Sequence, residues 1–180
     1  MKRSLLLALL LATALGTAER PRVTRVALEA MEKTFDQRVL RFDLNDPFDL
    51  LGSTRGVYLE GYGAVFTAEV NLVAGAVITP FRPAPDREQI ERLRQKKQER
   101  VALLKKHMRE MLLNLAASLE AVPPSEQIAL GVSVFYFSWE NREALPSQVL
   151  MRARRQTLLD AQARHAGDAT LEKLILVEEF

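Results

Sequence analysis

Hydrophobic and polar positions along this chain recur with two periods, one typical of helices and one typical of strands. Residues 21–38 show the first, because their apolar residues lie at helical spacing among charged neighbours. These apolar residues are Val23, Ala27, Ala30, Met31 and Phe35. The pattern predicts a first amphipathic helix. Residues 43–49 are rich in turn formers, and Pro47 disfavours helical backbone at the residue before it, so we expect a loop to follow.

A strand pattern with period two occupies residues 56–72. Ala64, Phe66 and Val70 alternate with more polar residues, and Val57 with Leu59 begins the same alternation earlier. Gly61-Tyr62-Gly63 separates the two parts, and glycine accepts the backbone angles that a tight turn needs. The pattern predicts a hairpin of two strands. One long strand that is bulged at the glycines is the alternative.

A single long helix is predicted for residues 86–122, with Asp86 as its N-cap. Its first half, from Asp86 to Arg100, is nearly all polar. Its second half carries apolar residues at heptad spacing: Val101, Leu104, Met108, Met111, Leu115 and Val122. We therefore expect the second half to pack on the domain and the first half to project into water.

The remaining residues predict a strand, a helix and a second strand. Residues 127–139 carry apolar or small residues on both faces, which indicates a central strand. A helix is expected from Ser147, as N-cap, to about Ala166, and a strand over residues 171–180. The chain is thus predicted to be one α+β domain with about four strands packed by helices, in the order α-β-β-α-β-α-β.

The N-terminus has the organisation of a secretory signal peptide. Lys2 and Arg3 precede an apolar stretch, and small residues lead up to Ala18. The stretch is about eleven residues long, against the roughly 20 that a membrane-spanning helix needs. We expect residues 1–18 to be removed after Ala18 and a single domain, residues 19–180, to be periplasmic or secreted with no integral membrane span. A buried N-terminal helix is the alternative.

Charge and cysteine content exclude several classes of function. Cleavage after Ala18 removes two of the 25 basic residues and none of the 23 acidic ones, so the mature chain is formally neutral. Nucleic-acid binding depends on clustered Lys and Arg, so we expect none. The chain has no cysteine, which excludes disulfides, thiol nucleophiles and cysteine-ligated metal centres. An exported protein without disulfides depends on its core for stability.

Few residues are candidates for catalysis or ligand binding. Glu60 and Glu69 are predicted to face each other across the hairpin, as a carboxylate pair would in a hydrolase. His107, Met108 and Met111 are soft metal ligands, but the methionines fall on the apolar face of the long helix, so we expect core residues and no metal or other cofactor.

Aromatic residues offer one further candidate. Tyr58 and Tyr62, with Phe66, form a candidate aromatic surface for a ligand or peptide, and the run Phe135-Tyr136-Phe137-Ser138-Trp139 supplies further aromatic residues. Aromatic residues in strands more often belong to the core.

Residues 56–66, Gly-Val-Tyr-Leu-Glu-Gly-Tyr-Gly-Ala-Val-Phe, are similar to a segment that recurs in exported bacterial proteins of unknown function. The resemblance covers about a tenth of the chain. It implies an exported bacterial protein and transfers no catalytic residue.

The sequence therefore favours a non-enzymatic binding or assembly protein of the bacterial cell envelope. Its expected partner is another protein or a second copy, bound through the polar helix half from Asp86 to Arg100. The alternative is a hydrolase that uses Glu60 and Glu69.

Overall fold

The computed structural model describes residues 22–42, 45–74 and 85–180, so the predicted signal peptide lies outside the described residues. These residues form four helices and a six-stranded mixed sheet. The elements follow one another as α1 (Arg25–Arg41), β1 (Asp49–Leu50), β2 (Arg55–Leu59), β3 (Gly63–Asn71), α2 (Arg87–Ser118), β4 (Gln127–Val134), β5 (Gln148–Arg154), α3 (Arg155–Ala163), α4 (Asp168–Leu174) and β6 (Leu176–Glu179). The predicted α+β class is confirmed.

The sheet is organised around one parallel pair of strands. β3 and β4 run parallel over eight residue pairs, from Gly63 opposite Gln127 to Val70 opposite Val134. All other pairs are antiparallel: β1 and β2 both lie along the outer side of β3, and β5 and β6 follow β4 in that order. The predicted central strand is confirmed as β4, which is paired on both sides.

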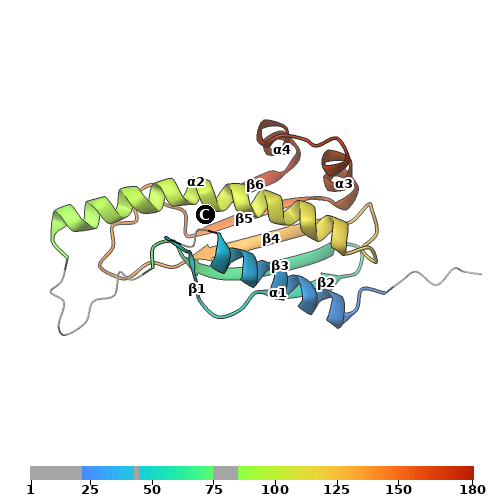
Figure 1. Cartoon of the computed structure of the whole chain (residues 1–180), viewed down its shortest axis with the longest axis horizontal. Helices are drawn as coiled ribbons and strands as arrows, with labels where there is room; N and C mark the ends of the chain where they lie inside the picture. The colour runs from blue at the N-terminus through green and yellow to red at the C-terminus, as the bar shows by residue number, and fades with distance from the viewer. Residues whose placement is uncertain (1–21, 43–44, 75–84) are drawn as a thin grey trace, which may run out of the picture.

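The helices lie on one face of the sheet, where the core forms. In Figure 1, α1 and α2 both lie on the viewer's side of the strands, with α3 and α4 beside the end of α2. Strand residues that point toward these helices are buried, as the alternating pattern requires. They pack against one apolar side of α2, and the largest fully buried residues include Phe66, Leu104, Met108, Leu112, Leu115, Ile128, Leu130 and Met151.

The predicted hairpin is confirmed as β2 and β3, which pair antiparallel from Arg55 opposite Thr67 to Leu59 opposite Gly63. The alternative of one bulged strand is wrong. Gly61 and Gly63 adopt φ angles of 80° and 133°, which disfavour a side chain. Gly63 is also pressed against β4, where a Cβ atom would overlap the backbone oxygen of Gln127.

The predicted helix from Ser147 is wrong in its first half, because residues 148–154 form strand β5. Val149, Met151 and Ala153 are buried while their neighbours are not, and burial at every second residue is typical of a strand. The free edge of β4 supplies the hydrogen-bond partners that make this short segment a strand. Ser147 caps no helix, and its side-chain oxygen donates to the carbonyl of Phe180 over 2.9 Å.

Two further boundaries differ from the sequence prediction. The final segment divides into helix α4 and strand β6, so only its last part is the expected strand. The predicted loop over residues 43–49 lies partly outside the described residues, and its last residue, Asp49, belongs to the two-residue strand β1, which pairs with the end of β3. The two unexpected strands, β1 and β5, raise the number of strands from the expected four to six. Short strands of this kind form because the edge of a neighbouring strand is available for pairing. The local sequence pattern gives no information about that neighbour.

The long helix begins where the sequence predicts, because Asp86 and Gln89 form a reciprocal capping box. Its 32 residues reach about 48 Å. Its first turns are exposed and extend past the strands in Figure 1. The predicted projection stops short of Arg100, however, because Lys97 and Arg100 are both buried. Arg100 donates to the side chain of Asp46 over 2.6 Å and stacks on Phe48.

The two turn glycines give a test of the β3–β4 junction. Gly61→Ala should lower the free energy of unfolding by about 1–2 kcal/mol, since only the backbone angle opposes a side chain there. Gly63→Ala should lower it by about 3 kcal/mol or more, because the added Cβ also displaces the backbone of Gln127. Urea denaturation of both variants measures the difference. Equal losses would contradict the close contact at Gly63.

Candidate functional site

Among the described residues, no helix covers the face of the sheet that points away from α1 and α2 (Figure 1). Strand pairing aligns Val57, Val65, Ala129, Arg152 and Leu176 in one row across five strands. Val57 and Leu176, at the two ends of this row, are each 51% exposed. Four of these five residues are apolar and the fifth is Arg152, and apolar side chains exposed on an open sheet face mark a candidate interaction surface.

The next row on this outer face has its smallest residue, Gly131, in the central strand. It contains Arg55, Thr67, Gly131, Leu150 and Glu178, again in register across the strands. Gly131 is buried, although no helix covers it, because the side chains of Leu150 and Thr67 lie over it at 3.7 and 3.9 Å from the position of a Cβ. Small residues in the central strand therefore make the middle of the face shallow.

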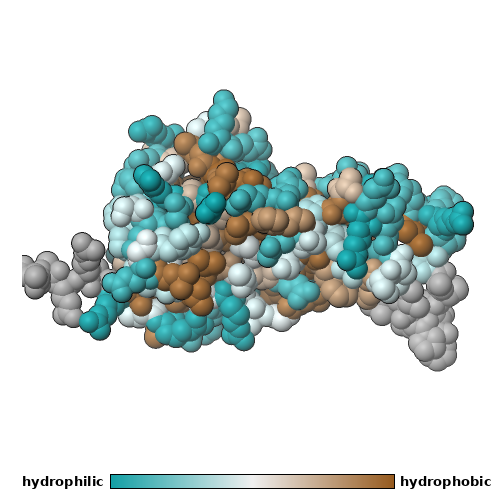
Figure 2. Space-filling view, turned by 180° about the vertical axis from the view of Figure 1, so that it is seen from behind, coloured by the Kyte–Doolittle hydropathy of each residue, from teal (hydrophilic) through white to brown (hydrophobic). Residues whose placement is uncertain are grey.

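Three aromatic rings continue the outer face beyond the end of β4. Tyr136 points inward, with Lys97 of α2 above its ring, so Phe135 and Phe137 point outward by strand alternation. Phe137 packs edge-on against Phe135, with ring centroids 4.9 Å apart, and stacks on Trp139 at 5.5 Å. All three side chains are half-buried. Figure 2, seen from the side opposite Figure 1, shows apolar areas with hydrophilic side chains between them.

The predicted tyrosine pair does not form one surface. Tyr58 lies on the inward face of β2 and packs against the core, whereas Tyr62 is at the hairpin turn and is exposed. The aromatic surface of this protein comes instead from Phe135, Phe137 and Trp139. The sequence signal for it was the run of aromatics at alternate positions after a strand.

The predicted carboxylate pair is not brought together. Glu60 lies in the turn after β2, whereas Glu69 lies near the far end of β3, where Leu51 donates to its backbone oxygen. The hairpin register places Gly63 opposite Leu59, so six residues of β3 separate the turn from Glu69. At about 3.3 Å per residue, the expected facing arrangement is excluded. The predicted turn is correct, but Leu59 already pairs with Gly63, so Glu60 lies within the turn and faces no residue of β3.

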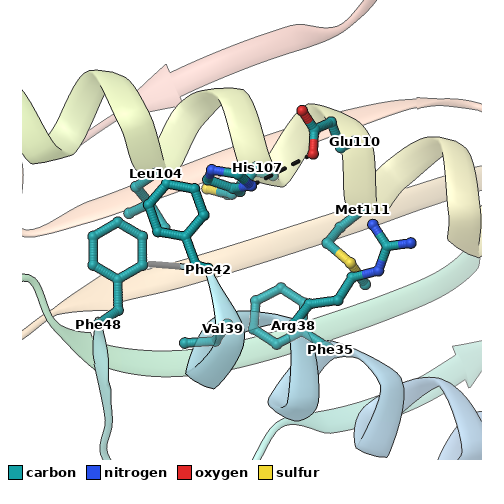
Figure 3. A pocket seen from close by; sticks show the side chains of 10 residues that line it. Phe35, Arg38, Val39, Phe42, Phe48, Leu104, His107, Glu110 and Met111 are labelled. Carbon is teal, nitrogen blue, oxygen red and sulfur yellow. Dashed lines mark ion pairs between the residues drawn. The ribbon is translucent and has the colours of Figure 1, made fainter. Parts of the chain in front are cut away.

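The predicted metal alternative, His107, Met108 and Met111, lines a small chamber between α1 and α2. Figure 3 shows His107 beside Phe42 and directed toward Glu110, while Met111 lies on the side of Arg38. His107 and Glu110 therefore line the same chamber as the methionines. Met108 and Met111 are buried, in agreement with their expected place in the core.

A buried ion pair between α2 and the loop after β4 was not anticipated from the sequence. The ammonium of Lys97 has no exposed surface and lies 2.6 Å from the carboxylate of Glu140, which is 3% exposed. It also donates to the carbonyl of Phe135 over 3.1 Å. Burial lowers the pKa of Lys97, and the hydrogen bond with Glu140 opposes that shift.

Tyr136 completes this cluster, which holds the loop on the helix. Its hydroxyl donates to the carbonyl of Pro146 over 2.8 Å. Burial, aided by the charge of Glu140, raises the pKa of Tyr136 to about 12, so the phenol stays protonated at neutral pH. Lys97, Tyr136 and Glu140 line neither the pockets between α1 and α2 nor the pocket beside α3 and α4, and their contacts with one another are structural.

Lys97 and its neighbour Lys96 make a matched pair for testing this cluster. Lys97→Met should lower the free energy of unfolding by about 3–5 kcal/mol, because Glu140 is then left buried without its partner. Lys96→Met breaks an ion pair with Asp46 that is largely exposed, and should cost less than about 1 kcal/mol. Adding Glu140→Gln to Lys97→Met should recover part of the loss. Similar melting temperatures for the two single variants would show that the buried pair contributes little.

Comparisons with other proteins add no further assignment. In the described ranges, no three or more His, Asp or Glu side chains gather as a metal site would require, and no helix is long and apolar enough to cross a membrane. The chain matches no protein-family model, no curated protein and no solved structure.

Proposed function

We propose that this protein is a non-enzymatic, exported binding module of the bacterial cell envelope, and that it binds a partner protein on the outer face of its sheet. The observation that carries the proposal is the apolar row from Val57 to Leu176, continued by the half-buried rings of Phe135, Phe137 and Trp139. Apolar surface that includes partly exposed aromatic residues is typical of protein interfaces.

The residues of this face indicate what kind of surface the partner protein presents. Its middle is shallow, since Ala129 and Gly131 lie in the central strand, and it accepts a flat apolar surface such as a strand or a helix side. Arg55 and Arg154 are exposed at its margins, and Arg152 is already paired with Glu178 at 3.4 Å. Carboxylates at the rim of the partner would complement the two marginal arginines.

The exposed start of α2 is the second proposed contact. Its charges are balanced within the helix, where Arg92 pairs with Glu88 and Arg94 with Glu91. Ile90 and Leu93 supply a narrow apolar stripe that is only half-buried. The proposed contact is limited to residues 86–96, because Lys97 and Arg100 belong to the packed part of the helix.

The hydrolase alternative has lost its geometric basis, since Glu60 and Glu69 lie at opposite ends of β3. Acid–base catalysis by two carboxylates requires both to reach one substrate bond.

Export gives a direct test of the proposed location. The mature protein should begin at Glu19, because the small residues before Ala18 fit signal-peptidase cleavage. Mass spectrometry of the chain from an envelope fraction measures this. A chain that still contains residues 1–18 would contradict the export proposal without affecting the binding surface.

Photo-crosslinking tests the proposed binding face. A photoreactive amino acid at Val57 or Leu176 should give the same partner adduct in cells, since both positions are half-exposed ends of one row. The same amino acid at Val26, which is 75% exposed on α1, is the control and should give none. Leu150→Glu, in the middle of the face, should abolish both adducts because it places an unpaired charge in the interface.

Three outcomes of that experiment would change the proposal. Adducts from Val26 as strong as those from Val57 would show nonspecific contact. An adduct of twice the mass of the chain would identify a second copy in place of a foreign partner. With a further probe at Ile90, in α2, an adduct from that position alone would move the binding site to the helix.

A further inference from the structure

The chamber between α1 and α2 combines an apolar interior with a basic entrance. Rings of Phe35, Phe42 and Phe48 and the side chains of Leu104, Met108 and Met111 form its walls. Its free volume of about 20 Å³ is enough for one water molecule. Methionine side chains are flexible, so two walls of this chamber are able to move for a larger apolar group.

The chamber adjoins an open groove of about 350 Å³, lined by Thr34, Gln37, Arg38, Arg41, Phe42 and His107. Three residues, Arg38, Phe42 and His107, line both the chamber and the groove. Figure 3 shows the ring of Phe42 beside His107 at the boundary, with Arg38 on the other side of the chamber. A molecule in the groove therefore lies next to both the apolar walls and the arginines.

The entrance of the groove carries positive charge. Arg38 and Arg41 lie in the last turn of α1, where the helix dipole favours cations, and both are exposed. Within the described residues, neither has a carboxylate within ion-pairing distance. Lys106 adds a third positive charge beside His107. Glu110 is the one acid that lines the chamber, and its carboxylate faces His107 Nδ1 at 3.5 Å.

His107 leaves a polar atom unsatisfied at the boundary. Its Nε2 is buried and has no hydrogen-bond partner, whereas its Nδ1 faces Glu110. A buried polar atom without a partner is destabilising, and a ligand or a ligand-bound water would relieve that cost.

We infer that the α1–α2 groove binds a small single-chain amphiphile, with its anionic head on Arg38 and Arg41 and its alkyl end against Phe42 and the chamber. A carboxylate or phosphate head would form charge-assisted hydrogen bonds with the two guanidinium groups. The alkyl end would be removed from water by the aromatic and methionine walls. This site is separate from the outer sheet face, so the inference does not depend on the proposed partner protein.

Methionine-methyl NMR tests the inference, with octanoate as the probe. Octanoate below its micelle-forming concentration should shift the methyl resonances of Met108 and Met111 saturably. The methyl of Met151, which is fully buried in β5, is the internal control and should not move. Octylammonium, which has the same chain and the opposite charge, should bind at least tenfold more weakly. Octyl phosphate should bind like octanoate, since the head-group chemistry is shared.

A pair of charge reversals separates the groove from general electrostatics. Arg38→Glu with Arg41→Glu should weaken octanoate binding at least tenfold. Arg87→Glu with Arg92→Glu changes the charge equally on the exposed start of α2 and should leave binding unchanged. Equal weakening by both pairs, equal binding of octylammonium, or a shift of Met151 together with the other methyls would overturn the site. Binding only to vesicles of anionic phospholipid, with no octanoate effect, would also overturn it.

Discussion

The parallel pairing of β3 with β4 is the constraint on which the rest of the structure depends. Two parallel neighbours cannot be joined by a tight turn, so the chain must cross from the end of β3 to the start of β4 over one face of the sheet. The 32 residues of α2 make most of that crossing. Because the connection runs on one face, the apolar sides of both strands point to α2, and the core forms there.

Buried polar contacts then fix the helices and loops against this core. Glu32 of α1 accepts from the backbone of Gly56 and from Arg25, each over less than 3 Å. Burial opposes its ionisation, but these hydrogen bonds hold the pKa of Glu32 below its ordinary value. Arg155 fixes the other end of α2 by donating to the carbonyls of Ala116 and Val122. Such contacts supply the positional specificity that disulfides often provide in exported proteins.

The connection from β3 to β4 over one face of the sheet also explains where the two proposed binding surfaces lie. Helices that share one face leave the other face open, and small residues at Ala129 and Gly131 keep its middle shallow. On the covered face, α1 and α2 touch only along part of their length, so their side chains leave a chamber and a groove. The two proposed sites therefore lie on opposite faces of the sheet and have different chemistry, one flat and apolar and the other concave and basic.

The sequence by itself determined the elements whose signals are local. The hairpin followed from the alternation after Gly63, the start of α2 from Asp86, and the central place of β4 from its two apolar faces. The burial of Met108 and Met111 followed from heptad spacing. In each case, the signal lies within a few residues and needs no distant partner.

Only the tertiary structure decided what depends on distant partners. Residues 148–154 became a strand because the edge of β4 was free to pair with them, although their apolar spacing also fits a helix. Lys97 is buried because Glu140, 43 positions later, lies above it, and a polar helix half carries no sign of such a partner. The open sheet face and the basic groove exist only once strand register and helix packing are set, because each is assembled from residues far apart in the chain.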